Sequence, residues 1–287
     1  MFDKFETLKN EPLKNHTTFR IGGPAKYFVL PKNLDELKEV LNICKTKNMR
    51  YFVIGNGSNI LASDKGFDGV IISLKHFNSI KKRKYMGNVY VTCGCGVNLF
   101  YLNKYLCENS IEGLEWSYGI PASVGGAIKM NAGAYNHSIG EFVKKIIVLK
   151  EGKIESIKNP KFEYRKSPIK NEIVLYAQFS LHIGNKENIK NQMETNLSKR
   201  KKSQPYDMAS AGSVFKRNGN LFPAKIIDEL GLKGLRLGDA MISKKHAGFI
   251  VNLGNASYSD ISKLIALLKK IFNAFNYSFE EEIIYLI

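Results

Sequence analysis

The stretch Gly119–Tyr135 reads GIPASVGGAIKMNAGAY, and eight of its seventeen residues are glycine or alanine. Residues with small side chains let the backbone come close to a bulky neighbour. Tight packing of a helix on a sheet would account for the alanines, but not for Gly-Ile-Pro at one end or Asn-Ala-Gly-Ala-Tyr at the other. We therefore predict that this segment contacts a cofactor, with the successive backbone amides of Gly125 and Gly126 available to an anion.

A second glycine-rich turn, Gly55–Asn59, directly follows the apolar run Tyr51–Ile54. A strand and a glycine-rich turn suggest phosphate binding, although an ordinary strand-end turn would also use Asn-Gly-Ser-Asn. The dinucleotide fingerprint needs glycine at position 60 and a following helix, whereas this chain has Ile60 and then turn signals at 64–66. An ordinary Rossmann domain is therefore not expected. Two separate glycine loops suit a long cofactor such as FAD, held by two lobes.

The composition indicates an ordinary globular protein. The chain has 287 residues, 44% of them hydrophobic and 24% charged, which is enough for two or three domains. No apolar run approaches the ~18 residues of a membrane span, and the first residues lack the apolar core of a signal peptide, so we expect a cytoplasmic protein. The four cysteines are few and scattered, which predicts neither a disulfide framework nor a metal site.

The formal net charge is +17. Nucleic-acid binding is one explanation of such a charge. The densest basic runs, 81–84 and 199–202, are short, and neither belongs to a recognisable nucleic-acid module. Solvated lysine-rich faces and attraction of phosphorylated small molecules explain the charge better. We therefore predict no nucleic-acid partner and no membrane partner.

Periodicity predicts an α+β protein. A helix should start after Pro31–Asn33, and helices are also expected at 99–107, 185–202, 223–230 and 260–275, the last with Ser259 as its N-cap. Strands are expected at 51–54, 70–74, 89–92, 172–182, 249–253 and 283–287, with a hairpin formed by 143–150 and 153–157. A domain boundary is predicted near Gly184-Asn185.

Three further segments carry more polar residues than folding demands: 162–168, 203–216 and 280–282. A loop arginine, a tight Ala-Gly-Ser turn and a solvated acidic run are the ordinary explanations of these features. Gly212-Ser213 lacks the Gly-x-Ser-x-Gly elbow of hydrolases. Spacing alone therefore selects no catalytic serine or carboxylate.

The order of the motifs is more specific than any single one. NHTTFRIGG (15–23) is followed by GNGSNIL, GIPASVGGAIKMNAGAY, YRKS, SAGSVFK, GLKG, KKHAGFIVN and a terminal Glu-x-Glu-Ile. This series resembles the UDP-N-acetylenolpyruvoylglucosamine reductase family from about residue 10 to the C-terminus. The short connection between Tyr164 and Gln204 resembles the shorter (type II) form of that family.

The resemblance implies a fold and a reaction. The fold is a vanillyl-alcohol-oxidase-type FAD-binding domain in two lobes (1–184, split near 75–80), followed by a smaller α+β substrate-binding domain (185–287). The reaction uses NADPH to reduce FAD, and then transfers hydride to the enolpyruvyl group of UDP-N-acetylglucosamine enolpyruvate. UDP-N-acetylmuramate results, for peptidoglycan and thus for cell-wall synthesis, cell shape and cell division. A monomer is expected.

The resemblance also assigns residues. Its proton-donating serine falls on Ser213, its catalytic arginine on Arg165 and its carboxylate on Glu282. Substrate contacts are implied for Tyr164, Gln204 and Lys216. The implied cofactor-binding residues are Gly55, Asn56, Gly57, Ser58, Asn59, Gly119, Ile120, Pro121, Ser123, Gly125, Gly126, Asn131, Gly133 and Ala134.

Two positions depart from the family's pattern. Gly248 stands where the family usually has asparagine, and Ala122 stands where glycine is common. Two other hypotheses are kept: another FAD-dependent oxidase of the same fold acting on an alcohol or hydroxy acid, and a basic nucleic-acid-binding protein without redox activity. The segment SAGSVFK and the terminal glutamates favour the reductase over the other oxidases.

Overall fold

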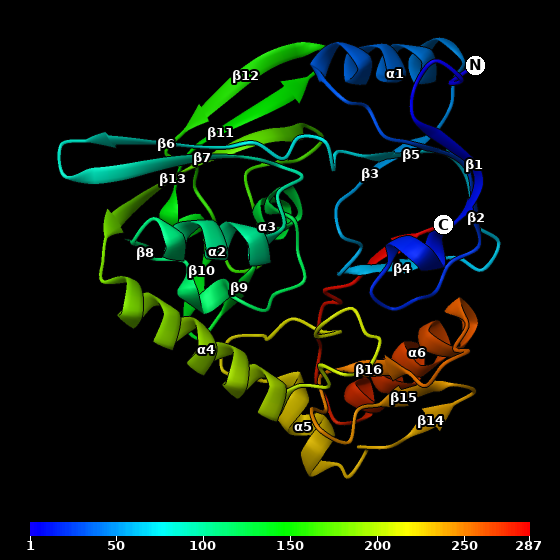
Figure 1. Ribbon diagram of the computed structural model, residues 1–287. Coiled ribbons are helices and arrows are strands. Elements are labelled where there is room, and N and C mark those ends of the chain that lie inside the picture. The colour runs from blue at the N-terminus through cyan, green and yellow to red at the C-terminus, as the bar shows by residue number, and fades with distance from the viewer. The chain divides into compact units, whose positions relative to one another are not determined.

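The computed structural model describes residues 1–287 (Figure 1), and the chain forms two compact units. The first unit consists of Met1–Thr7, Val29–Asn56 and Ile71–Lys199, and the second of Leu8–Phe28, Gly57–Val70 and Arg200–Ile287. The chain thus passes between the units five times. The predicted domain boundary near 184 stays a prediction.

Strands on which the division of the chain falls belong to one four-stranded sheet of order β1-β2-β5-β3. The four strands of this sheet are β1 (Thr7–Pro12), β2 (Pro24–Val29), β5 (Phe67–Ser73) and β3 (Tyr51–Ile54). The division falls within β1, β2 and β5. Helix α1 (Leu34–Thr46) begins where predicted, because the Asn33 side chain accepts a hydrogen bond from the Glu36 amide at 2.9 Å.

A six-stranded antiparallel sheet dominates the first unit, with the order β12-β11-β13-β7-β6 and β8 paired to β13. Every second residue of β7 and β13 is buried, including Val91 and Phe179, which lie opposite each other. Helices α2 and α3 lie on one side of this sheet (Figure 1). The bounds are β6 (Ile80–Tyr85), β7 (Asn88–Gly94), α2 (Leu99–Glu108), β8 (Ile111–Glu112), α3 (Val124–Met130), β9 (Gly133–Ala134), β10 (His137–Ser138), β11 (Val143–Lys150), β12 (Lys153–Lys158) and β13 (Ile173–Ile183).

The two edges of this sheet are hairpins with the same kind of turn. In β6–β7 the turn residues are Met86 and Gly87, and in β11–β12 they are Glu151 and Gly152. All four residues have positive φ, between 48° and 78°. Two-residue turns of this conformation match the twist of the strands that they join.

Helix α4 (Lys186–Ser203) follows β13 and belongs to the first unit as far as Lys199. Its Ile189 and Met193 are buried with Cys107 of α2. The helix that was predicted at 185–202 is therefore confirmed.

The second unit has a core built from distant parts of the sequence. Phe19 and Leu61 are fully buried together with Val214 and the apolar face of α6. Strand β17, near the C-terminus, pairs in parallel with β4, with Ile284 opposite Ile60. The elements are β4 (Ile60–Ala62), α5 (Pro223–Glu229), β14 (Arg236–Leu237), β15 (Ala240–Ile242), β16 (Ile250–Asn252), α6 (Tyr258–Ala274) and β17 (Ile284–Leu286), where β14-β15-β16 form an antiparallel sheet.

One predicted helix start is wrong. The N-cap of α6 is Ser257 and not Ser259. The Ser257 hydroxyl accepts from the Asp260 amide at 3.0 Å, and the Asp260 carboxylate accepts from the Ser257 amide at 3.0 Å. This reciprocal pair fixes the start two residues earlier. No helix of the chain is long and apolar enough to cross a membrane.

Candidate active site

The two glycine-rich segments meet in the first unit. Ser123 is the N-cap of α3, and its hydroxyl accepts from the Gly126 amide at 3.2 Å. A Cβ atom at Gly55 would lie 2.4 Å from the Ser123 hydroxyl oxygen. The absence of a side chain at Gly55 therefore lets these two segments lie against each other.

The amides of Gly125 and Gly126 are occupied within the protein. Gly125 donates to the Cys95 carbonyl at 2.8 Å, while Gly126 donates to Ser123. The prediction that these two amides are available to an anion is therefore wrong, because they fix the start of α3. Close packing also explains Gly125, whose Cβ would lie 2.9 Å from the Cβ of Cys95.

Gly126 differs from Gly125, because the surrounding protein leaves space for a side chain at this position. The nearest atom to a Cβ at this position would be the Ser123 hydroxyl oxygen at 3.4 Å, an ordinary contact distance. A glycine inside a helix costs about 0.5–1 kcal/mol relative to alanine. Since the protein's own packing does not require glycine here, this position fits the close approach of a bulky cofactor.

Asn131 connects the alanine-rich segment to the loop that carries Arg165. It ends α3 in the left-handed conformation, with φ of 43°. Its buried side chain donates to the Glu163 carbonyl at 2.7 Å and accepts from the Gly140 amide at 3.0 Å. Both ends of the amide are thus used to hold backbone segments together.

Arg165 is oriented by the same segment. It is half-buried, has φ of 54°, and donates to the carbonyls of Asn131 and Gly133 at 3.5 and 3.2 Å. Its guanidinium carbon lies 5.3 Å from the ring centre of Tyr164. The structure therefore brings together Arg165, Tyr164 and the second half of the predicted cofactor-binding segment.

In the second unit, the segments of Ser213 and Glu282 run side by side. Val214 donates to the Gly248 carbonyl at 2.9 Å and accepts from the Glu282 amide at 2.7 Å. Bridges of Ser213 to Phe249 and of Phe215 to Glu281 continue the pairing on either side. Ser213 and Glu282 are both half-buried. Two of the three predicted catalytic residues thus lie on neighbouring extended segments.

The two glutamates before Glu282 have partners of their own. Glu280 accepts from the Lys216 ammonium at 2.8 Å, and Glu281 accepts from that of Lys269 at 2.7 Å. Glu281 also accepts from the Tyr285 hydroxyl, and burial raises the pKa of this tyrosine. Glu280 and Glu281 therefore each pair with a different lysine.

The first glycine turn also contributes to the second unit. A Cβ at Gly57, where φ is 61°, would lie 2.0 Å from the His16 carbonyl oxygen. The Asn59 side chain donates to the Glu282 carbonyl at 2.8 Å. Gly57 is therefore required by packing, and Asn59 positions the segment of Glu282.

Thr18 was not singled out from the sequence, yet it links two parts of the site. Its hydroxyl donates to the Ser210 carbonyl at 2.6 Å, and its amide donates to the Gly57 carbonyl at 3.3 Å. In the sequence, Thr18 stands out only as one residue of the motif NHTTFRIGG.

Gln204, a predicted substrate contact, accepts a hydrogen bond from the Arg200 guanidinium at 3.3 Å.

The departure at Gly248 has a local explanation. A Cβ there would lie 3.1 Å from atoms of both Ala224 and His246. The Gly248 amide donates to Nδ1 of His246 at 3.1 Å, and burial lowers the pKa of this imidazole. A side chain at position 248 would thus press on the His246 ring.

The cysteines do not form a reactive pair. Burial raises the pKa values of Cys93 and Cys95 to about 12, so both thiols stay protonated at neutral pH. No group of three or more His, Cys, Asp or Glu side chains is arranged to hold a metal ion.

Comparisons with known proteins bear directly on this arrangement. Residues 25–157 match a family model described as an FAD binding domain. Residues 204–286 match one described as the C-terminal domain of UDP-N-acetylenolpyruvoylglucosamine reductase. The reductase of Caldicellulosiruptor bescii is 42% identical, over 97% of this chain and 90% of its own length, and that of Clostridium novyi is 43% identical, over 94% and 88%.

The chain belongs to the UDP-N-acetylenolpyruvoylglucosamine reductase family. The crystal structure of the reductase from Thermus caldophilus is 33% identical, with a TM-score of 0.83 over 99% of both chains. Cholesterol oxidase of Brevibacterium sterolicum shares the fold alone, with 14% identity and a TM-score of 0.50 over 63% of this chain. The fold class predicted from the resemblance is confirmed, and the reductase is an FAD-dependent oxidoreductase.

The residues of the first unit fit the cofactor that the family uses. The room beside Gly126 and the contact of Gly55 with Ser123 leave bare backbone at the two segments predicted to hold FAD. The competing hypotheses, another oxidase of this fold and a nucleic-acid-binding protein, are not favoured by the comparisons.

Proposed function

We propose that Ser213, Arg165 and Glu282 carry the chemistry of this reductase. The enzyme reduces the enolpyruvyl group of UDP-N-acetylglucosamine enolpyruvate to give UDP-N-acetylmuramate, with FAD as cofactor and NADPH as hydride donor. The observation that carries the assignment is the pairing of the Ser213 and Glu282 segments through Val214. This pairing lies within the region that matches the family's own C-terminal domain.

The backbone around Gly55 and Gly126 would hold FAD, which would supply to the substrate the hydride that NADPH provides. The hydride adds to one carbon of the enolpyruvyl double bond, and the electron pair of that bond moves to the carbon beside the carboxylate. The Ser213 hydroxyl donates its proton to this second carbon as a general acid. The C–C double bond is thereby reduced, with one hydride and one proton added.

Arg165 stabilises the charge that develops before the proton arrives. As the electron pair moves, negative charge spreads from the carbon onto the substrate carboxylate. The guanidinium is already oriented by the carbonyls of Asn131 and Gly133, so little reorganisation is needed during the reaction. A pre-oriented donor of this kind contributes about 3 kcal/mol to transition-state stabilisation.

Glu282 supports the same charge in one of two ways. A protonated Glu282 would donate a hydrogen bond to the developing enolate, whereas an ionised Glu282 would orient a neighbouring donor. Glu280 pairs with Lys216 and Glu281 with Lys269, and the family's pattern assigns the catalytic carboxylate of the run to Glu282. The main chain of Glu282 is fixed by Val214 and Asn59, which suits either action.

The ligand-binding residues are assigned from the resemblance to the family. We assign the cofactor to the bare backbone around Gly55 and Gly126, and substrate contacts to Tyr164, Gln204 and Lys216. Because FAD, NADPH and the UDP-sugar are polyanions, the net charge of +17 favours their approach. We place this shorter-form enzyme in the cytoplasm as a monomer, where its product supports cell shape and division.

Ser213→Ala tests the central assignment. The substitution removes only a small hydroxyl, so folding, flavin content and reduction by NADPH should be retained. Reoxidation of the reduced enzyme by the enolpyruvyl substrate should slow by at least ~100-fold, the low end for a positioned general acid. Stopped-flow absorbance of the flavin measures the two half-reactions separately.

Two further variants sharpen the test. Ser213→Cys should keep part of the reoxidation rate, because a thiol can deliver a proton from the same position. Ser210→Ala is the matched control, since Ser210 contributes its carbonyl to Thr18 and should be affected much less. Reoxidation of Ser213→Ala at the wild-type rate would show that another group supplies the proton.

A further inference from the structure

The β6–β7 hairpin carries an uninterrupted basic run. Lys81, Lys82, Arg83 and Lys84 follow one another along β6, and all four are exposed. No Asp or Glu occurs between residues 69 and 107. The Lys82 ammonium contacts the Asn109 side chain, and Arg83 lies over the Tyr85 ring at 5.7 Å. None of the four cations has a carboxylate partner within ion-pair distance.

The opposite edge of the same sheet provides a comparison. The β11–β12 hairpin has the same turn conformation, but its turn begins with Glu151 and its strands mix charges, with Lys150 3.9 Å from Glu155. Lysines on an edge strand discourage pairing with other chains. That explanation accounts for β12 and for the lysines of β6, but not for the residues at the tip of the β6–β7 hairpin.

The tip exposes apolar side chains at a conformational cost. Met86 is 81% exposed and Tyr85 is 51% exposed. Met86 also adopts φ of 48°, at a turn position where asparagine or glycine is preferred. A methionine is thus disfavoured here both by its backbone conformation and by its contact with water. Its presence indicates a partner for the exposed side chain.

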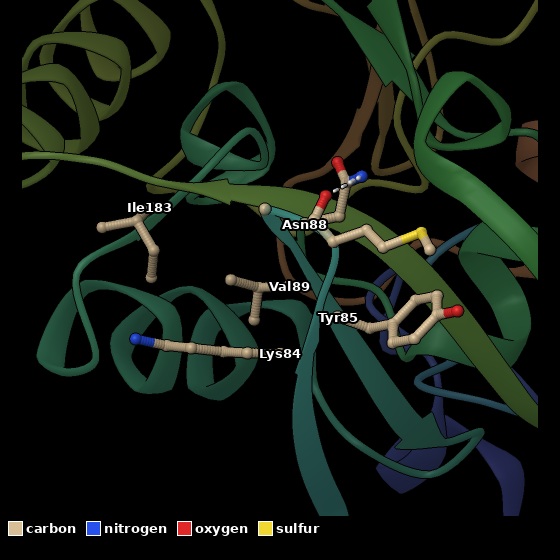
Figure 2. A pocket seen from close by; sticks show the side chains of 7 residues that line it. Lys84, Tyr85, Asn88, Val89 and Ile183 are labelled. Carbon is tan, nitrogen blue, oxygen red and sulfur yellow. Dashed lines mark hydrogen bonds between the residues drawn. The ribbon is translucent and has the colours of Figure 1, made fainter.

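The cations surround this tip on both faces of the hairpin. Because side chains alternate, Lys82 and Lys84 share one face, while Lys81, Arg83 and Tyr85 share the other. Figure 2 shows Lys84, Val89 and Ile183 on one side of the hairpin and Tyr85 on the other. A hollow of about 300 Å³ lies beside the turn, lined by Lys84, Asn88 and Ile183 among others. The tip therefore combines apolar ends, flanking cations and a small hollow.

We infer that the β6–β7 hairpin docks this reductase on an anionic lipid bilayer, with Tyr85 and Met86 entering the interfacial region and the four cations contacting lipid phosphates. A polybasic segment and apolar side chains act together, because the cations are attracted to an anionic surface and the apolar side chains enter its interfacial region. Tyrosine favours the boundary between headgroups and hydrocarbon. A nucleic acid would use the cations but gives no reason for an exposed methionine in a strained turn.

This inference differs from the sequence-based prediction of no membrane partner. That prediction rested on the lack of a long apolar run, whereas docking by a hairpin needs only two apolar residues at the tip. The sequence shows Met86 beside a basic run, but it does not show that β6 is an edge strand or that Met86 is exposed.

Flotation of the FAD-loaded enzyme with vesicles tests the proposal. We expect binding to vesicles of phosphatidylcholine and phosphatidylglycerol, loss of binding as salt is added, and no binding to phosphatidylcholine alone. The double variant Lys81→Gln, Arg83→Gln should bind about tenfold or more weakly, because each cation near an anionic surface contributes separately. Met86→Asn should also weaken binding, and it keeps the fold because Asn-Gly is the preferred turn sequence.

The matched control is the double variant Lys153→Gln, Lys158→Gln on β12, which removes the same net charge from the opposite edge and should bind vesicles as the unchanged enzyme does. All variants should reduce the substrate at the wild-type rate, since none lies in the proposed catalytic machinery. The proposal is overturned if the unchanged enzyme ignores anionic vesicles, if the control pair loses as much binding as the hairpin pair, or if Met86→Asn binds at full strength. Hairpin-dependent binding of single-stranded DNA without vesicle binding would assign the surface to nucleic acid instead.

Discussion

Gly57 and Gly126 belong to two different glycine-rich segments and are glycine for different reasons. At Gly57 a side chain would collide with the His16 carbonyl, and the backbone is left-handed. At Gly126 a Cβ would meet only the Ser123 hydroxyl at an ordinary distance. The sequence places both residues in cofactor-binding segments, but it does not separate a glycine that the fold needs from one that leaves room for a ligand.

Gly126→Ala should therefore separate stability from cofactor binding. Alanine favours α3 by about 0.5–1 kcal/mol, so thermal unfolding of the apoprotein should be unchanged or slightly higher. FAD affinity should fall, because the new methyl group occupies space that we assign to the cofactor. Calorimetry of the apoprotein and titration with FAD measure the two effects.

Gly57→Ala is the contrasting variant. It should destabilise the second unit whether or not FAD is present, because the collision is with the protein's own backbone. Unchanged FAD affinity in Gly126→Ala would remove the reason for placing the cofactor beside that residue.

Elements with a regular apolar pattern could be predicted from the sequence, and the catalytic loops could not. Helices α1 and α6 show clear apolar stripes, α4 has only Ile189, Met193 and Leu197 on one face, and the structure contains all three helices within a few residues of the predicted bounds. Strand β6 was missed, because the basic sequence of an exposed edge strand does not alternate between apolar and polar residues. The contacts of Arg165 and Thr18 were missed as well, since they involve backbone carbonyls from segments distant in sequence.

His246, which lies just before β16, should make the free energy of unfolding depend on pH. Burial lowers the pKa of His246, and its Nδ1 accepts from the Gly248 amide, so the folded chain favours the neutral imidazole. The unfolded chain binds this proton at a higher pH than the folded chain does. The stabilisation is therefore complete above about pH 6.5, the ordinary histidine value, and is lost as the pH falls through the lowered pKa of the folded state.

Denaturation at a series of pH values measures this effect. The free energy of unfolding of the unchanged protein should decrease more steeply between about pH 7 and pH 5 than that of His246→Gln, which has no imidazole to protonate. Carboxylates with lowered pKa values act at lower pH and should affect both proteins equally. Identical slopes for the two proteins would contradict the proposed protonation state of His246.

At the scale of the whole molecule, the core of the second unit is built from residues near both ends of the sequence. This core needs Phe19, Ile21 and Leu61, which lie far before the predicted boundary near 184 in the sequence. Hydrophobic patterning identifies these residues as apolar, but it does not show which core they join. The family motifs, by contrast, could be identified from the sequence, because their order along the chain does not depend on how the chain folds.

The fragment 185–287 should therefore fail to fold alone. Loss of a large buried side chain costs about 3 kcal/mol, and three such losses approach the total stability of an ordinary domain. We expect a non-cooperative thermal transition and strong binding of a hydrophobic dye, whereas the full chain unfolds cooperatively. A sharp thermal transition of the fragment, without binding of the dye, would show that residues 185–287 complete a core of their own.

The parallel pairing of β17 with β4 also has a consequence for the chain as it leaves the ribosome. Ile60–Ala62 are made early, but their partners Ile284–Leu286 are made only after the more than 200 residues between them. At roughly 5–20 residues per second, an apolar strand would wait on the order of ten to forty seconds for its partner. During that time Leu61 has no completed core to enter, so this apolar segment stays exposed on the nascent chain until β17 has been made.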